Sequence, residues 1–254
     1  MATEPTIILI PGSFAIPALY YNVTKPLAAQ GYDIYTLNLQ TTEKKPGKLP
    51  TLADDATYIA KNVEILADQG KDVVLVGHSY GGVPITEAAK GLSKKHRESK
   101  GKKGGIVRLA YMTAVVPKLG YSCAEHNGDD VALDYDGWLD FTDLALAASY
   151  VFSDLPPEEG HRMMQLFPQH SGPSFADKLT YEGYKDVPCS YLFCEEDKVI
   201  TPVVQQRGID AIEAASGKKV DVWRLSCDHC PTKSVPEKSI EWFKHLVELG
   251  GKEA

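Results

Sequence analysis

The sequence has no long hydrophobic run and little cysteine. No apolar stretch among its 254 residues reaches the roughly 18 residues of a membrane-spanning helix, so no membrane protein is expected. The opening MATEPTIILIPG has no basic region before its apolar run, so no signal peptide is expected either.

Acidic residues outnumber basic ones, 34 to 27, and the net charge of −7 argues against nucleic acid or an anionic membrane as a partner. Five cysteines, an odd number, argue against a disulfide framework and favour a reduced, cytoplasmic protein.

Short apolar runs alternate with helical patterns along most of the chain. Strands are predicted at Thr6–Ile10, Tyr32–Leu39, Asp72–Val76, Ile106–Val116, Cys189–Cys194 and Val220–Leu225. Helices are predicted at Ala18–Gln30, Leu52–Gln69, Gly82–Leu92, Gln205–Ala215 and Val235–Leu249. This alternation predicts an α/β fold with a mainly parallel central sheet flanked by helices, and the continuous apolar strands indicate that both faces are covered.

Two segments interrupt this rhythm. The stretch Lys90–Gly105 is rich in lysine and glycine and lacks the aromatic residues of a single-strand nucleic-acid site, so we interpret it as a solvated surface loop. Residues 118–187 are helix-leaning, rich in aromatic residues and without clear sheet strands. We expect them to form a helical cap, or lid, inserted into a core made of residues 1–117 and 188–254.

One glycine-flanked serine follows the third predicted strand. In VVLVGHSYGGVPITEAAK, Ser79 lies between Gly77 and Gly81, with a strand pattern before it and a helix pattern after it. A sharp strand-to-helix turn needs small flanking residues and exposes the serine oxygen. The turn also places the amide of Tyr80 at a helix N-terminus, where it favours a developing oxyanion. The pattern predicts a nucleophilic serine, and an ordinary glycine-rich turn is the alternative.

A serine nucleophile requires a base and a carboxylate that orients the base. His78 is predicted to point away from the serine and to pack, whereas His229 follows the last predicted strand, where ligand-side residues collect in an open sheet. His229 is therefore the predicted base. The segment SYLFCEEDKVITP offers Glu195, Glu196 and Asp197 at the end of a strand, and Asp197 fits the strand–loop position best.

The loop after the first predicted strand, IILIPGSFAIP, should supply a second amide for the oxyanion. Gly12 permits the turn, and Ser13 is preferred over Phe14 as the donor. Phe14, Trp138 and Phe141 are the predicted substrate-binding residues.

The pair Cys227-x-x-Cys230 flanks the predicted base. Together with His229 and Cys194 it could suggest zinc, but a structural zinc site needs two well-spaced ligand pairs, and a redox motif belongs early in a βαβ unit. Small buried cysteines are the favoured interpretation, and neither a metal nor a cofactor is expected.

The chain resembles proteins of the α/β-hydrolase fold, in the branch that holds plant methylesterases, hydroxynitrile lyases and microbial esterase-like proteins. The resemblance covers nearly the whole chain, and the segments that carry it are IILIPGSF, VVLVGHSYGG, YLFCEEDKVITP and CDHCPTKSVPE. It implies the chain order Ser79, Asp197, His229. The positions that match the threonine and lysine of the lyases are Gly12 and Cys230, and neither can replace those groups, which disfavours lyase activity.

These features predict a cofactor-independent serine hydrolase, a carboxylesterase or lactonase, acting on a small and largely apolar molecule. C–C bond or other non-hydrolytic chemistry with the same residues is one alternative, because fold does not settle chemistry. A ligand-binding protein that retains the triad is another. A small-molecule substrate is the expected partner, and a homodimer is an arrangement that the sequence leaves open.

Overall fold

The core of the molecule is a six-stranded sheet in which every neighbouring pair of strands is parallel. The computed structural model describes residues 4–128 and 135–252. The strands of this sheet are β1 (Thr6–Ile10), β2 (Ile34–Thr36), β3 (Asp72–His78), β4 (Gly105–Met112), β7 (Cys189–Cys194) and β8 (Asp221–Leu225). Their spatial order is β2-β1-β3-β4-β7-β8. The mainly parallel sheet predicted from the sequence is therefore confirmed.

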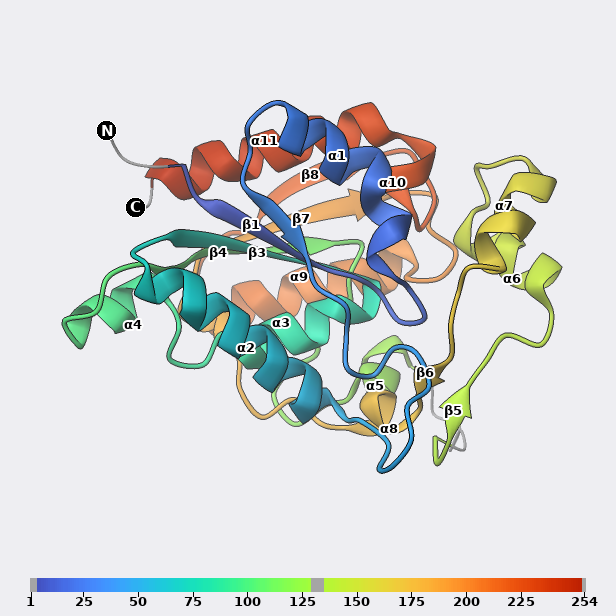
Figure 1. The fold of residues 1–254 in the computed structure, drawn as a ribbon, viewed down its shortest axis with the longest axis horizontal. Coiled ribbons are helices and arrows are strands. Elements are labelled where there is room, and N and C mark those ends of the chain that lie inside the picture. The colour runs from blue at the N-terminus through green and yellow to red at the C-terminus, as the bar shows by residue number, and fades with distance from the viewer. Residues whose placement is uncertain (1–3, 129–134, 253–254) are drawn as a thin grey trace.

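Helices cover both faces of the sheet, as Figure 1 shows. They are α1 (Tyr21–Ala29), α2 (Leu52–Asp68), α3 (Gly82–Ala88), α4 (Lys94–Ser99), α9 (Pro202–Ser216), α10 (Pro231–Ser234) and α11 (Pro236–Lys252). Helices α1 and α11 pack on one face, and α2, α3 and α9 pack on the other. Within the described ranges, no helix is both long and apolar enough to cross a membrane.

Strand β1 shows why the strands are apolar without interruption. Ile7 and Leu9 join the cluster under α1 and α11, whereas Ile8 and Ile10 join the cluster under α2 and α3. Because successive side chains of a strand point to opposite faces, a sheet covered on both sides needs an apolar residue at every position.

The second strand is shorter than predicted. It ends at Thr36, whereas the sequence predicts a strand over Tyr32–Leu39. Beyond it, the amides of Gln40 and Thr41 donate to the buried carboxylate of Asp55 on α2, at 2.6 and 3.1 Å. These bonds draw the chain away from the sheet edge.

The interpretation of Lys90–Gly105 as a solvated loop is wrong in part. Helix α4 begins after Ser93, whose hydroxyl accepts from the amide of His96 at 3.3 Å. Arg97 on this helix is only 2% exposed and donates to the carbonyl of Gly104 at 3.0 Å. Its guanidinium also binds Asp68 at 2.5 Å. One buried arginine thus folds a lysine-rich segment back against α2.

The segment 118–187, where the sequence predicts the cap, lies between β4 and β7. Its described elements are α5 (Cys123–Asn127), β5 (Trp138–Leu139), α6 (Leu144–Val151), α7 (Pro157–Met164), β6 (His170–Ser171), α8 (Pro173–Ala176) and a short 3₁₀ turn, η3 (Gly183–Lys185). Residues 129–134 of this segment lie outside the described residues. Strands β5 and β6 form a small antiparallel ladder that the sequence does not predict. Helices α6 and α7 lie beyond the carboxyl ends of the central strands (Figure 1).

Replacing Arg97 with methionine should lower the free energy of unfolding by on the order of 2 kcal/mol, because the carbonyl of Gly104 then loses its charged donor. Lys95→Met, two residues away on the exposed side of α4, should change it by less than about 0.5 kcal/mol. Urea denaturation of both variants measures the difference. Equal stability of the two would show that Arg97 does not anchor this segment.

Candidate active site

Ser79 occupies a strained turn directly after β3. Its φ angle is 53°, a left-handed value that residues other than glycine rarely adopt, and α3 begins three residues later. A Cβ atom on Gly77 would lie 2.6 Å from the carbonyl oxygen of Gly81. A Cβ atom on Gly81 would lie equally close, 2.6 Å, to the carbonyl oxygen of Pro11 on the neighbouring loop. Neither position has room for a side chain, so glycine is required at both. The missing side chains allow the strand to turn sharply into the helix.

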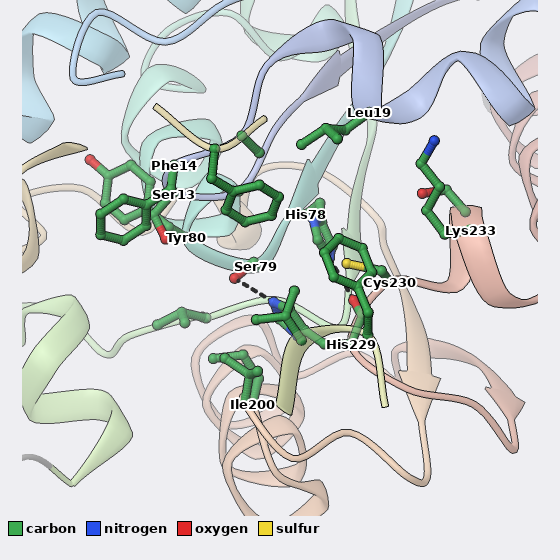
Figure 2. Close-up of a pocket in the computed structure, with 18 of the residues that line it drawn as sticks. Ser13, Phe14, Leu19, His78, Ser79, Tyr80, Ile200, His229, Cys230 and Lys233 are labelled. Atoms are coloured by element: carbon green, nitrogen blue, oxygen red, sulfur yellow. Dashed lines mark hydrogen bonds between the residues drawn. The ribbon is translucent and has the colours of Figure 1, made fainter. Parts of the chain in front are cut away.

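Three side chains predicted from the sequence meet at the carboxyl end of the sheet. The Nε2 atom of His229 lies 3.0 Å from Oγ of Ser79, and its Nδ1 atom lies 2.7 Å from Oδ2 of Asp197. Figure 2 shows the bond between Ser79 and His229. A carboxylate only accepts, so Nδ1 carries the imidazole proton and Nε2 is free to accept the proton of Ser79.

Asp197 is fully engaged by donors although it is 3% exposed. One oxygen accepts from His229 and from the hydroxyl of Thr113, and the other accepts from the amides of Val199 and Ile200 at 2.7 and 3.0 Å. Burial would raise the pKa of Asp197, but the charge and hydrogen bond of His229, with those from Thr113 and Val199, lower it below its usual value. Asp197 is therefore a carboxylate that can stabilise a positive charge on His229.

The geometry separates Asp197 from its acidic neighbours. Glu195 and Glu196 are exposed, and Glu196 accepts from the hydroxyl of Ser226 at 3.4 Å, whereas it is Asp197 that contacts the His229 ring, at 2.7 Å. Thr113 could not be identified from the sequence, because it belongs to no recognisable motif. It follows β4 with a φ angle of 37° and is completely buried beneath Asp197.

The loop after β1 lies against Ser79. Gly12 does not have a positive φ, but a Cβ atom there would lie 3.0 Å from Cβ of Ser79, so the close approach of the loop to Ser79 leaves little room for a side chain. The amides of Gly12 and Phe14 already donate to side chains. The amide of Ser13, between them, and that of Tyr80, in the first turn after β3, remain as donors beside Ser79.

A largely apolar cavity of about 260 Å³ opens over Ser79. Phe14 and Phe141 line it, with their ring centroids 4.7 Å apart. Trp138 does not belong to the wall, because it lies in β5 and pairs with Ser171 of β6. The other apolar wall residues described are Ala15, Leu19, Val115, Cys123, Val151, Phe152, Phe167, Phe175, Val199, Ile200 and Cys230. The only cation in the described wall is Lys233.

His78 does more than the packing predicted for it. Its ring is hydrogen-bonded to the hydroxyl of Tyr20 at 2.7 Å and to the backbone carbonyl of His229 at 2.8 Å. Burial, together with the nearby charge of His229, lowers the pKa of His78 to about 3, so the ring stays neutral. Its partners are far away in the chain, so no local motif indicates them.

The loop that carries His229 is held by the residue before it. The buried carboxylate of Asp228 accepts from the amide of Cys230 at 2.9 Å, the hydroxyl of Ser234 at 2.8 Å and the amide of Asp154 at 3.0 Å. In return, the amide of Asp228 donates to the carboxylate of Asp154 at 2.9 Å. Burial raises the pKa of Asp228 despite these bonds. The loop is thereby joined to the segment between α6 and α7.

All five cysteines are buried, and their side chains are thiols. The thiol of Cys227 donates a hydrogen bond to the sulfur of Cys194 at 3.5 Å. In residues 4–128 and 135–252, no group of three or more His, Cys, Asp or Glu side chains is placed to hold a metal ion.

Buried neutral histidines should make the protein less stable in mild acid. Burial lowers the pKa values of His78 and His170 to about 3 and that of His126 to about 4. When the pH is below 6.5, the usual pKa of histidine, these residues are protonated in the unfolded chain but stay neutral in the folded chain. Stability that is present above pH 6.5 is therefore lost as the pH falls. Asp55 acts in the opposite direction, because burial raises its pKa to about 6. Asp197 has a lowered pKa, so it affects the pH dependence of stability only at pH values below the range in which the histidines act.

We therefore expect the free energy of unfolding to fall by on the order of 4 kcal/mol between pH 7 and pH 5. Urea denaturation at both pH values measures the loss. His126→Gln should reduce the loss by about 2 kcal/mol, close to half, because each buried histidine contributes about that much and Asp55 offsets part of the total, whereas His96→Gln on the exposed side of α4 should leave it unchanged. A stability that does not change with pH would contradict the assignment of neutral buried histidines.

Comparison with known proteins identifies the family of this chain. A family model described as the alpha/beta hydrolase family matches residues 7–242. The chain is 37% identical over 240 residues to a protein named probable hydrolase R7 from a Phoma species, covering 93% of this chain and 95% of that one. It is 27% identical to a pyrethroid hydrolase of Sphingobium wenxiniae, covering 94% of this chain and 86% of that one. An extracellular alpha/beta-hydrolase of a Paenibacillus species, described as homologous to tobacco salicylic acid binding protein 2, superposes with a TM-score of 0.74 at 17% identity, covering 95% of this chain and 98% of that one. The chain therefore belongs to the alpha/beta hydrolase family and is a hydrolase whose relatives include proteins named hydrolases.

Proposed function

We propose that this hydrolase cleaves a carboxylic ester or lactone of a small, largely apolar molecule with Ser79 as its nucleophile. The observation that carries the proposal is the position of His229. Its ring bridges Ser79 at 3.0 Å and Asp197 at 2.7 Å at the floor of an apolar cavity. Nucleophile, base and orienting carboxylate are the three groups that acyl transfer from an ester requires.

In the proposed reaction, Oγ of Ser79 attacks the carbonyl carbon while Nε2 of His229 takes the serine proton. Asp197 keeps Nδ1 protonated and stabilises the imidazolium that forms. The amides of Tyr80 and Ser13 donate to the oxyanion of the tetrahedral intermediate. His229 then protonates the leaving alcohol and afterwards activates a water molecule, which releases the acid from Ser79.

The cavity favours an uncharged substrate. Its described wall is dominated by aromatic and aliphatic side chains, and a volume of about 260 Å³ suits a small molecule and not a polymer. The segment 118–187 contributes Phe141, Phe152, Phe167 and Phe175 to that wall, and we propose that it is the cap of the site. The pyrethroid hydrolase among the relatives bears a name that fits an apolar ester.

The proposal also includes a cellular location and a reaction without metal or cofactor. All five cysteines are buried thiols, which supports a reduced, cytoplasmic location. The proposed chemistry needs neither metal nor cofactor, because the attacking and proton-transferring groups are side chains of this chain. A homodimer stays a prediction.

Ser79→Ala should fold normally and lower kcat for a neutral aryl ester by at least about 10³-fold, because the nucleophile is removed. Intact-mass spectrometry after treatment with a fluorophosphonate should find one adduct on the wild type and none on Ser79→Ala. Ser149→Ala, on the exposed side of α6, should behave like the wild type. An unlabelled wild type that still turns over a C–C substrate or binds a ligand without turnover would favour the other two functions.

Asp197→Asn should lower kcat by about 10³- to 10⁴-fold, because an amide in place of the carboxylate favours the wrong imidazole tautomer and no longer offsets the imidazolium charge. Glu196→Gln, one residue away and exposed, should change kcat by less than about twofold. Steady-state kinetics with the same aryl ester compares the two. The reverse ranking would transfer the role to Glu196.

A further inference from the structure

Three consecutive amides in the loop after β1 have different environments. The amide of Gly12 donates to the hydroxyl of Tyr20 at 3.0 Å, and the amide of Phe14 donates to Nδ1 of His170 at 3.4 Å. Phe14 has a φ angle of 57°, so the loop is strained where His170 holds it. The amide of Ser13 lies between two occupied donors, at the wall of the cavity over Ser79.

The Tyr20 side chain joins this loop to the base. A backbone carbonyl only accepts, so Nε2 of His78 carries the ring proton and donates to the carbonyl of His229 at 2.8 Å. Nδ1 of His78 must then accept, which makes Tyr20 the donor at 2.7 Å. The oxygen of Tyr20 remains free to accept from Gly12. These hydrogen bonds form a buried series, and only this one assignment of protons gives each of its donors an acceptor.

His170 reaches the loop from the opposite side. It lies in β6, in the segment 118–187, and is fully buried. The hydroxyl of Ser174 donates to the carbonyl of Ser171 at 2.8 Å, so it accepts from Nε2 of His170 at 3.0 Å. Nδ1 of His170 is then an acceptor, which is the form that the amide of Phe14 needs. The ring is held in that form by its own neighbours.

We propose that Tyr20 and His170 are positioning residues that hold the loop after β1 from both sides and direct the amide of Ser13 to the oxyanion. The inference rests on the proposed function, because it concerns the intermediate formed on Ser79. Neither side chain donates to the substrate oxygen: both act through the backbone. Tyr20 also ties the same loop to His229 through His78, so the oxyanion donor and the base share one hydrogen-bonded line.

Tyr20→Phe removes a single oxygen that serves Gly12 and His78 together. We expect kcat for a neutral aryl ester to fall by about 10- to 100-fold with KM changed by less than about twofold, because the oxyanion exists only after attack. Tyr21→Phe is the matched control, since Tyr21 is the next residue and is 44% exposed. It should leave both constants unchanged.

A pair of ketones separates positioning from a merely structural role. An aryl trifluoromethyl ketone takes Oγ of Ser79 on its carbonyl carbon while the serine proton passes to His229, and its oxygen becomes an oxyanion. The matching aryl methyl ketone occupies the cavity without forming the adduct. Tyr20→Phe should raise Ki for the trifluoromethyl ketone by about 10-fold or more and leave Ki for the methyl ketone within about twofold. Equal weakening of both ketones, or of neither, would overturn the inference.

His170 is tested by two substitutions. His170→Leu removes the acceptor and should give the same split between the ketones, whereas His170→Asn keeps an acceptor near the position of Nδ1 and should recover part of the trifluoromethyl ketone affinity. If His170→Leu does not fold, the His170→Asn and Tyr20→Phe results decide. An inactive, unlabelled wild type would overturn the proposed function and this inference with it. An active wild type with an unaffected Tyr20→Phe would reject the positioning roles alone.

Discussion

The arrangement of this site depends on the turn at Ser79. A residue with a φ angle of 53° fits between β3 and α3 because Gly77 and Gly81 leave the space that their side chains would fill. The carbonyl oxygen of Ser79 also accepts from the amide of Val115, at 3.0 Å, which ties the turn to the chain beyond β4. The strain is thus held by neighbouring strands, and the serine hydroxyl is presented at the carboxyl end of the sheet.

The remaining groups reach the turn because parallel strands end at the same edge. Asp197 follows β7, and His229 follows β8, the strand that pairs with it. Each residue is then fixed by its own loop. Asp197 accepts from the amides of Val199 and Ile200. His229 is held between Asp228 and Cys230, because the carboxylate of Asp228 accepts from the amide of Cys230. Short local bonds therefore set the geometry of a site assembled from distant parts of the chain.

This division explains what the sequence could predict. Ser79, Asp197 and His229 were accessible because each belongs to a local pattern: a glycine-flanked turn, an acidic strand end and a histidine after the last strand. Tyr20, His78 and His170 were not, because their partners lie 58, 151 and 156 positions away and only the fold brings them together. The strands of the core and the mainly parallel sheet followed from alternating apolar runs and helical patterns. The basic segment was misjudged because composition does not show that one of its cations, Arg97, is buried against a backbone carbonyl.

The segment 118–187 is joined to the proposed catalytic loops at two separate places, and this limits how it can move. His170 accepts from the amide of Phe14 on the oxyanion side, and Asp154 exchanges two hydrogen bonds with Asp228 on the base side. A rigid displacement of the whole segment would break both attachments and remove the acceptor that holds Phe14 at a positive φ. A displacement of α6 and α7 alone would break the bonds between Asp154 and Asp228 but leave His170 as the acceptor of the Phe14 amide. The two attachments thus lie on different parts of the segment, one in β6 and the other between α6 and α7, so each part is fixed to the core separately.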